Sequence, residues 1–142
     1  MNNVLIGVLG SRLDHAGFNN KRWDRWRPSV SLLMHQELVI DQYVLLYLPD
    51  DEPLLAITLL DIAKISPGTQ VRPICMQIAD PWDLEEVYGV LLDISRELNW
   101  DIERNNYYVN ITTGTHVTQI CLFLLNEAHY LPGKLLQLSP SK

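Results

Sequence analysis

Polar and small side chains gather in two short segments of this 142-residue chain, each directly after an apolar run. The first segment holds Gly10, Ser11 and Arg12. The second spans residues 110–116 and contains Asn110, Thr112, Thr113, Gly114, Thr115 and His116. Free N–H groups at a helix start attract anions, glycine allows close approach, and hydroxyl groups add neutral donors. The second segment therefore predicts a site for a phosphate or a sugar.

A different interpretation of the second segment needs no ligand. Thr115 would cap the following helix, and Thr112 and Thr113 would satisfy backbone groups of the turn. His116 falls in the first helical turn, where the helix dipole favours a neutral imidazole. Ligand contact, acid–base chemistry and a purely structural role all remain open for this histidine.

A basic aromatic segment spans residues 18–28, with Lys21, Arg22, Trp23 and Arg25 as candidate contacts to RNA. Arginine beside aromatic rings is typical of single-stranded RNA sites, where cations pair with phosphates and rings stack on bases. Alternatively, Trp23 anchors on the core and the charges stay solvated. The formal net charge of −6 excludes a protein that coats nucleic acid by bulk attraction.

Several kinds of site are excluded by spacing. No Gly-Lys-Ser/Thr loop or dinucleotide-binding glycine fingerprint occurs, so a nucleotide triphosphatase or a classical dehydrogenase is not expected. The four histidines lack the tight spacing of metal ligands. Cys75 and Cys121 lie far apart in apolar segments, which predicts reduced, buried thiols. We therefore expect no metal site, no cofactor and no assignable catalytic residue.

Short apolar runs alternate with longer segments of helical spacing, a pattern typical of βαβ units. Strands are predicted over 4–9, 43–48, 71–78, 107–111 and 135–138, and helices over 28–37, 53–65, 81–98 and 116–128. The run 4–9 is apolar throughout, as expected of a central strand. Pro73 predicts an edge position for its strand, because proline cannot donate to the sheet ladder.

Two helices give more detailed predictions. Asp80 is expected to cap the third helix, with Pro81 at its first position. Leu84 would then begin its inward face. In the last helix, the spacing predicts an inward face that carries Val117, Ile120, Phe123, Leu124 and Ala128.

The chain is thus expected to form one α/β domain over residues 1–142, with a mainly parallel central sheet and helices on both faces. In such sheets ligands bind at the carboxyl ends of the strands, where both polar segments fall. The sequence has neither a long apolar span nor a secretory signal, which predicts a cytoplasmic location and no membrane contact. The end directly after the fifth strand suggests a domain cut from a longer protein.

Five stretches carry a family resemblance: residues 10–12 (GSR), 22–28 (RWDRWRP), 80–89 (DPWDLEEVYG), 110–116 (NITTGTH) and 127–132 (EAHYLP). With them the whole chain resembles the N-terminal CARF domain of the RtcR family, sigma-54-dependent transcriptional activators of the bacterial RNA-repair operon.

This resemblance implies a Rossmann-like CARF domain that forms a homodimer with the ligand site at the two-fold interface. It also implies recognition of RNA with a 2′,3′-cyclic phosphate end, while related CARF domains bind cyclic oligoadenylates. Binding would relieve autoinhibition of an AAA+ ATPase domain that acts on sigma-54 RNA polymerase, with a helix-turn-helix domain on DNA. The AAA+ and helix-turn-helix domains lie outside these 142 residues.

Three functions follow as hypotheses. The first is a non-enzymatic sensor in which the 110–116 loop takes phosphate or ribose, Ser11 and Arg12 face it, and the basic aromatic segment receives further RNA. The alternative is a ring-nuclease-like enzyme that cleaves cyclic oligoadenylate, with the hydroxyls or His116 stabilising the transition state. The third is a dimerisation module with a vestigial pocket.

Overall fold

Five parallel strands form one sheet in this computed structural model, which describes residues 1–35 and 37–139. The strands are β1 (Asn2–Val8), β2 (Gln42–Tyr47), β3 (Gln70–Cys75), β4 (Asn105–Asn110) and β5 (Lys134–Leu136). Their spatial order is β3-β2-β1-β4-β5. The predicted central position of β1 is confirmed. The chain adds β2 and β3 on one side of β1, and then β4 and β5 on the other. The strand order reverses between β1 and β4, and such sheets bind ligands at the carboxyl ends of the strands at this point.

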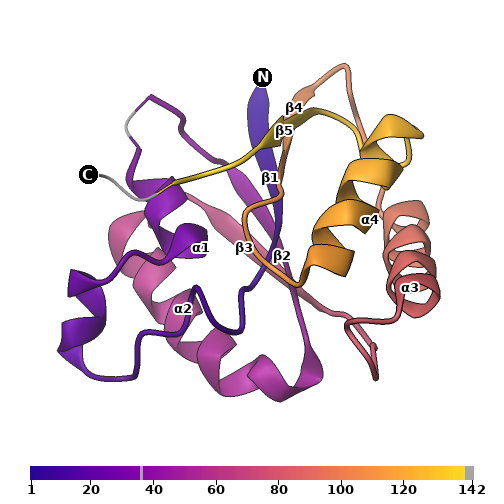
Figure 1. The fold of residues 1–142 in the computed structure, drawn as a ribbon. Helices are drawn as coiled ribbons and strands as arrows, with labels where there is room; N and C mark the ends of the chain where they lie inside the picture. The colour runs from indigo at the N-terminus through magenta and orange to yellow at the C-terminus, as the bar shows by residue number, and fades with distance from the viewer. Residues whose placement is uncertain (36, 140–142) are drawn as a thin grey trace.

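Helices cover both faces of this sheet (Figure 1), as predicted. On one face α1 (Pro28–Ser31) and α2 (Glu52–Ile65) enclose a core around Leu5, Tyr43 and Leu45. On the other, α3 (Leu84–Glu97) and α4 (His116–Glu127) enclose a core around Ile6, Val109 and Leu122. Three short 3₁₀ helices, η1 (Asn20–Asp24), η2 (Leu32–Met34) and η3 (Pro49–Asp51), lie in the connections. The α/β fold class is confirmed.

Two sequence predictions about the α1 and β3 regions have different outcomes. The predicted helix over 28–37 is shorter, because α1 tightens into η2 after four residues and the backbone at His35 is extended. Pro73 does lie in an edge strand, since β3 pairs only with β2 within the described residues.

The predicted start of α3 is wrong by one turn. Asp83, not Asp80, is the N-cap, and its carboxylate accepts hydrogen bonds from the amides of Glu85 and Glu86. Asp80 instead accepts the amide of Trp82 in a turn at 3.0 Å. The stretch 80–83 is consequently a loop, and it leaves Trp82 outside the helix.

The predicted inward face of α4 is wrong for most of its residues, although Val117 packs partly buried against the α3–α4 core as predicted. The side chains that α4 buries are Thr118, Cys121, Leu122 and Leu125. Ile120, Phe123 and Leu124 are 51%, 44% and 43% exposed. Leu84 at the start of α3 is 49% exposed, so it does not begin an inward face either. An apolar stripe therefore remains uncovered on the α3–α4 side of the domain.

Both cysteines carry free thiols, as expected, although only Cys121 is buried and Cys75 is half-buried. Burial raises the pKa of the Cys121 thiol. No helix in the described part of the chain combines the length and the apolar character that crossing a bilayer requires.

Candidate functional site

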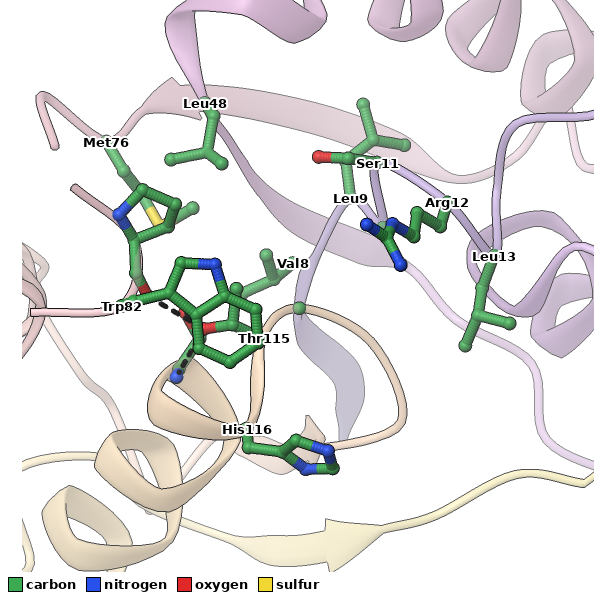
Figure 2. Close-up of a pocket in the computed structure, with 14 residues that line it drawn as sticks. Val8, Leu9, Ser11, Arg12, Leu13, Leu48, Met76, Trp82, Thr115 and His116 are labelled. Carbon is green, nitrogen blue, oxygen red and sulfur yellow. Dashed lines mark hydrogen bonds between the residues drawn. The ribbon is translucent and has the colours of Figure 1, made fainter. Parts of the chain in front are cut away.

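A cavity of about 430 Å³ opens at the carboxyl edge of the sheet, beyond the ends of β1 and β4. The β1–α1 loop, the start of α4 and the loop before α3 surround it (Figure 2). Its volume falls within the range of small-molecule sites. This carboxyl-edge cavity brings together the two polar segments that the sequence placed after β1 and β4.

The start of α4 forms part of the cavity wall, through Gly114, Thr115 and His116. Gly114 has a φ of +94°, a backbone conformation that side-chain-bearing residues rarely adopt, and it turns the chain from β4 into α4. The Thr115 hydroxyl caps the helix by accepting the amide of Thr118 at 3.1 Å. Within the described residues, the amides of His116 and Val117 donate to no acceptor. These first-turn amides can bind an anion.

The threonine hydroxyls of the 110–116 loop bond within the protein; Thr115 caps α4 as the interpretation without a ligand predicted, but Thr112 and Thr113 bond to distant segments rather than to the turn. Thr113 is fully buried and donates to the carbonyl of Val8. Thr112 accepts the amide of Leu138 at 2.7 Å. Thr115 donates to the carbonyl of Pro81 at 2.8 Å. Thr113 and Thr115 therefore use their O–H groups within the protein, and Thr112, which only accepts, does not line the cavity.

Asn110 lies beneath the cavity rather than in its wall. Its side chain is fully buried, and its amide oxygen accepts the backbone N–H of Thr112 at 3.0 Å. Its Nδ2 and the hydroxyl of Tyr43 have no hydrogen-bond partner among the described residues. Both side chains approach Gly7, where an added Cβ would lie 3.3 Å from the Tyr43 oxygen. Asn110 thus supports the loop from the interior.

The β1–α1 loop supplies the cavity's opposite wall. Gly10 donates its amide to Asp14 at 2.6 Å, and Ser11 donates its hydroxyl to Asp51 at 2.5 Å. Arg12 is exposed and forms no ion pair with any residue that the structure describes, and Figure 2 shows it across the cavity from Trp82. Arg12 and the exposed His116 are the two basic side chains that line this space.

Asp14 fixes the path of that loop. Its carboxylate accepts the Gly10 amide, the Ser29 amide at 2.8 Å and the Ser29 hydroxyl at 2.6 Å. The side chain is 1% exposed, and burial raises its pKa although the three hydrogen bonds act in the opposite direction. Asp14 therefore ties the cavity loop to the start of α1.

The basic aromatic segment lies away from the cavity lining, on η1 against α2. Lys21 and Arg25 are exposed. Arg22 is committed to Asp61, with Nε–Oδ2 and Nη2–Oδ1 distances of 2.8 Å each. The alternative interpretation holds for Trp23, which packs partly buried against the α1–α2 core.

Asp61 is the centre of this second cluster. Its buried carboxylate also accepts Arg27 Nη1 at 2.7 Å, and the Arg27 guanidinium lies 5.0 Å from the centre of the Trp23 ring. Burial alone would raise the pKa of Asp61, but the hydrogen bonds from Arg22 and Arg27 outweigh it and hold the pKa below its ordinary value. The cluster has the features of a structural ion pair, which are buried partners and saturated hydrogen bonds.

The sequence interpretation missed the apolar part of the cavity. Its walls include Val8, Leu9, Leu13, Leu48, Met76, Pro81 and Trp82. These residues are far apart in the sequence, and each is an ordinary apolar residue at a strand end or in a loop. The sequence therefore does not indicate that they share one wall. Only the loop between β3 and α3 has a pattern that could have indicated the wall, which is Trp82 directly after Pro81 and before α3 begins.

Metal binding finds no support in the described residues, 1–35 and 37–139. No three His, Cys, Asp or Glu side chains lie close enough together there to hold an ion.

Comparison with known families gives one match over residues 1–142, to the model described as the regulator of RNA terminal phosphate cyclase, RtcR. The transcriptional regulatory protein RtcR of Escherichia coli strain K12 is 44% identical over 139 residues, which are 98% of this chain and 26% of that protein. The chain therefore spans about a quarter of the length of this curated relative.

Solved structures with the same fold include two proteins of the CARF type. Csm6 from Enterococcus italicus, bound to cyclic hexa-2′-fluoro-hexa-dAMP, has a TM-score of 0.66 at 14% identity and matches 99% of this chain and 34% of that one. Can2 from Sulfobacillus thermosulfidooxidans, in complex with cyclic tetra-adenylate, has a TM-score of 0.63 at 14% identity, over 97% of this chain and 32% of that one. The fold is thus Rossmann-like and of the CARF type.

Proposed function

Because this chain belongs to the RtcR family of regulators of RNA terminal phosphate cyclase, we propose that it is the ligand-sensing domain of a transcriptional activator. Its ligand is an oligonucleotide with an accessible phosphate, either RNA ending in a 2′,3′-cyclic phosphate or a cyclic oligoadenylate. The observation that carries this proposal is the carboxyl-edge cavity, which both Arg12 and the first residue of α4, His116, line.

The charges around the cavity support a ligand with one phosphate at this point. Arg12, His116 and the two first-turn amides of α4 suit a single phosphodiester or cyclic phosphate, and no lysine among the described residues lines the space. The remaining lining is largely apolar and suits a base or ribose. Lys21 and Arg25 lie outside the cavity and remain candidates for contacts to a longer RNA.

The engaged threonines favour a sensor over a ring nuclease. Stabilising a transition state needs preorganised donors aimed at the reacting phosphate. The Thr113 and Thr115 hydroxyls instead donate within the protein, and Thr112 lies outside the cavity lining. Binding without cleavage requires only complementarity. The domain is therefore proposed to be non-enzymatic.

The exposed α4 stripe supports a homodimer. Ile120, Phe123 and Leu124 form an uncovered apolar patch that begins one turn after His116. Large exposed apolar patches mark interaction sites. A second copy that packs on this stripe would bring two carboxyl-edge cavities together, so one ligand could contact both.

In the complete regulator, ligand binding is proposed to relieve autoinhibition of an AAA+ ATPase domain that acts on sigma-54 RNA polymerase at DNA. The relative's additional length leaves room for such domains, since the match covers 26% of it. A cytoplasmic location is consistent with this role.

The proposal is tested by thermal shift with three probes: an RNA 5-mer ending in a 2′,3′-cyclic phosphate, the same RNA ending in a 3′-hydroxyl, and cyclic tetra-adenylate. The first or the third is expected to raise the melting temperature, and the ligand should be recovered intact after long incubation with excess protein. No shift with any probe would favour a dimerisation module, whereas time-dependent cleavage that is lost in His116→Ala would favour the nuclease.

Arg12→Ala is expected to weaken binding of the ligand found in that screen by about 10- to 100-fold, the usual effect of losing one charge-assisted hydrogen bond. The side chain is exposed, so melting temperature and oligomeric state should not change. Isothermal titration calorimetry measures the affinity, with Arg104→Ala as the control because Arg104 makes only a surface contact to Asp101. Unchanged affinity in Arg12→Ala would remove Arg12 from the site.

Phe123→Asp is expected to convert the dimer to a monomer, since a charge in the middle of an apolar interface is left unpaired and desolvated. Light scattering after size-exclusion chromatography measures the mass. Ile102→Asp is the control, because Ile102 is 69% exposed in the loop between α3 and β4. A wild-type monomer at high concentration, or a Phe123→Asp dimer, would place the contact elsewhere or exclude it.

A further inference from the structure

We propose that Trp82 is the base-stacking residue of the carboxyl-edge cavity and that Thr115 positions it. This inference rests on the proposed function, and it names the part of the ligand that the apolar wall recognises. A nucleobase would stack on the indole while its neighbouring phosphate meets the start of α4.

Trp82 contributes little to packing for so large a side chain. Its exposed fraction is 62%, and it belongs to neither of the two hydrophobic cores. The ring lines the cavity, together with Leu48 and Met76 on the same side (Figure 2). An aromatic face left open to solvent in an apolar recess offers a stacking platform.

The loop that carries Trp82 is held in place by hydrogen bonds at both ends. Glu86 accepts the amides of Ala79 and Asp80 at 3.0 and 2.8 Å. Asp80 accepts the Trp82 amide, and Asp83 caps α3 directly after it. The backbone at Trp82 is therefore fixed before a ligand arrives, which lowers the entropy cost of binding.

Thr115 links this loop to the anion-binding end of α4. Its hydroxyl donates to the Pro81 carbonyl at 2.8 Å and accepts the Thr118 amide at 3.1 Å. One oxygen atom thus connects the residue before Trp82 to the helix start that offers the His116 and Val117 amides. Thr115 sets the spacing between the stacking surface and the phosphate contact.

This arrangement selects a phosphate with a base directly beside it. Stacking tolerates any base because each has a π-face. Both a linear RNA end and a cyclic oligonucleotide contain that pair of groups, so separate probes are needed to tell them apart.

The test uses calorimetry with three probes: the dinucleotide ApA ending in a 2′,3′-cyclic phosphate, its analogue with an abasic terminal nucleotide, and cyclic tetra-adenylate. Wild-type protein should bind one base-bearing probe, and loss of the terminal base should weaken ApA binding about tenfold or more. Trp82→Ala should bind ApA only as tightly as wild type binds the abasic analogue, and Trp82→Phe should restore most of the difference. If only cyclic tetra-adenylate binds wild type, its affinity should fall about tenfold or more in Trp82→Ala.

Tyr130→Ala is the matched control, since Tyr130 is an exposed aromatic beyond the far end of α4. Equal wild-type affinity for the ApA pair, or unchanged affinity of Trp82→Ala for the probe that binds, would overturn the stacking role and leave the proposed function intact. Failure of wild type to bind any of the three probes would overturn both.

Thr115 is tested by the ratio of the affinities for ApA and its abasic analogue. If only cyclic tetra-adenylate binds, the ratio is that of its affinities without and with the Trp82→Ala substitution. Thr115→Val should lower the ratio towards one, while Thr115→Ser, which keeps the hydroxyl, should retain it. Loss of a helix cap alone would weaken both probes by the same factor. An unchanged ratio in Thr115→Val would overturn the positioning role.

Discussion

Asp61→Ala is expected to lower the free energy of unfolding by about 3–5 kcal/mol, the usual cost of removing one partner from a buried ion pair. Asp61 is 1% exposed, and it binds Arg22 through two hydrogen bonds and Arg27 through one. Without it, the Arg27 guanidinium stays buried beside Trp23 with no anion. Urea unfolding at pH 7, followed by circular dichroism, measures the change.

The pH dependence of the same pair gives a second readout. The arginines hold the folded-state pKa of Asp61 below its ordinary value, so Asp61 contributes stability above its unfolded pKa of about 4. That stability is lost as the pH falls through the lowered folded value. The difference in free energy of unfolding between wild type and Asp61→Ala should therefore become smaller at acidic pH. Asp93→Ala, an exposed aspartate on α3, is the control and should change little; equal stability of Asp61→Ala and wild type would contradict the assignment.

Gly133→Ala is expected to lower the free energy of unfolding by about 3–5 kcal/mol in the same urea measurement, because it combines backbone strain with overpacking. Gly133 has a φ of +103°, and an added Cβ would lie 2.0 Å from the carbonyl oxygen of Tyr107. The residue directly precedes β5, after which Leu138 donates its amide to Thr112. Displacing this segment should also loosen the 110–116 loop.

Two other glycines separate the causes of that loss. Gly17 has a φ of +80° and Gly68 has no positive φ, and neither would bring a Cβ within 4 Å of another atom. Gly68→Ala should be close to neutral, and Gly17→Ala should cost about 1–2 kcal/mol from conformation alone. A Gly133→Ala protein no less stable than Gly17→Ala would show that the close approach to Tyr107 does not matter.

The α/β fold follows closely from the sequence because the central strands β1, β2 and β4 contain buried apolar runs. β1 is apolar from residue 4 to its end, and the helices between strands show helical spacing, so local patterns predict the order of the elements. They do not predict the start of α3, because Asp80 and Asp83 are both good N-caps. The choice depends on Glu86, which reaches back to the Ala79 and Asp80 amides.

The inward face of α4 could not be chosen from its sequence either. The helix is apolar over most of residues 117–125, so both Leu122 and Phe123 belong to plausible stripes. Packing against α3 decides between them, and it leaves Phe123 on the surface. The choice of stripe therefore depends on tertiary packing, which the helix sequence alone does not contain.

A cavity does lie at the strand ends that the sequence indicated, but the contacts of its residues depend on distant parts of the chain. Thr112 is engaged by Leu138, and Arg22 by an aspartate 39 positions away. No local sequence pattern predicts hydrogen-bond partners so far away in the chain. The position of Trp82 in the cavity likewise follows from where α3 begins, not from its own neighbours.

The most direct test of the central claim is an NMR titration of ¹⁵N-labelled protein with the RNA or cyclic oligonucleotide that raises its melting temperature. The largest shifts are predicted for the His116 and Val117 amides and the Trp82 indole, with smaller ones across η1. Shifts centred on Lys21 and Arg25, with the start of α4 unchanged, would contradict a phosphate site in the carboxyl-edge cavity.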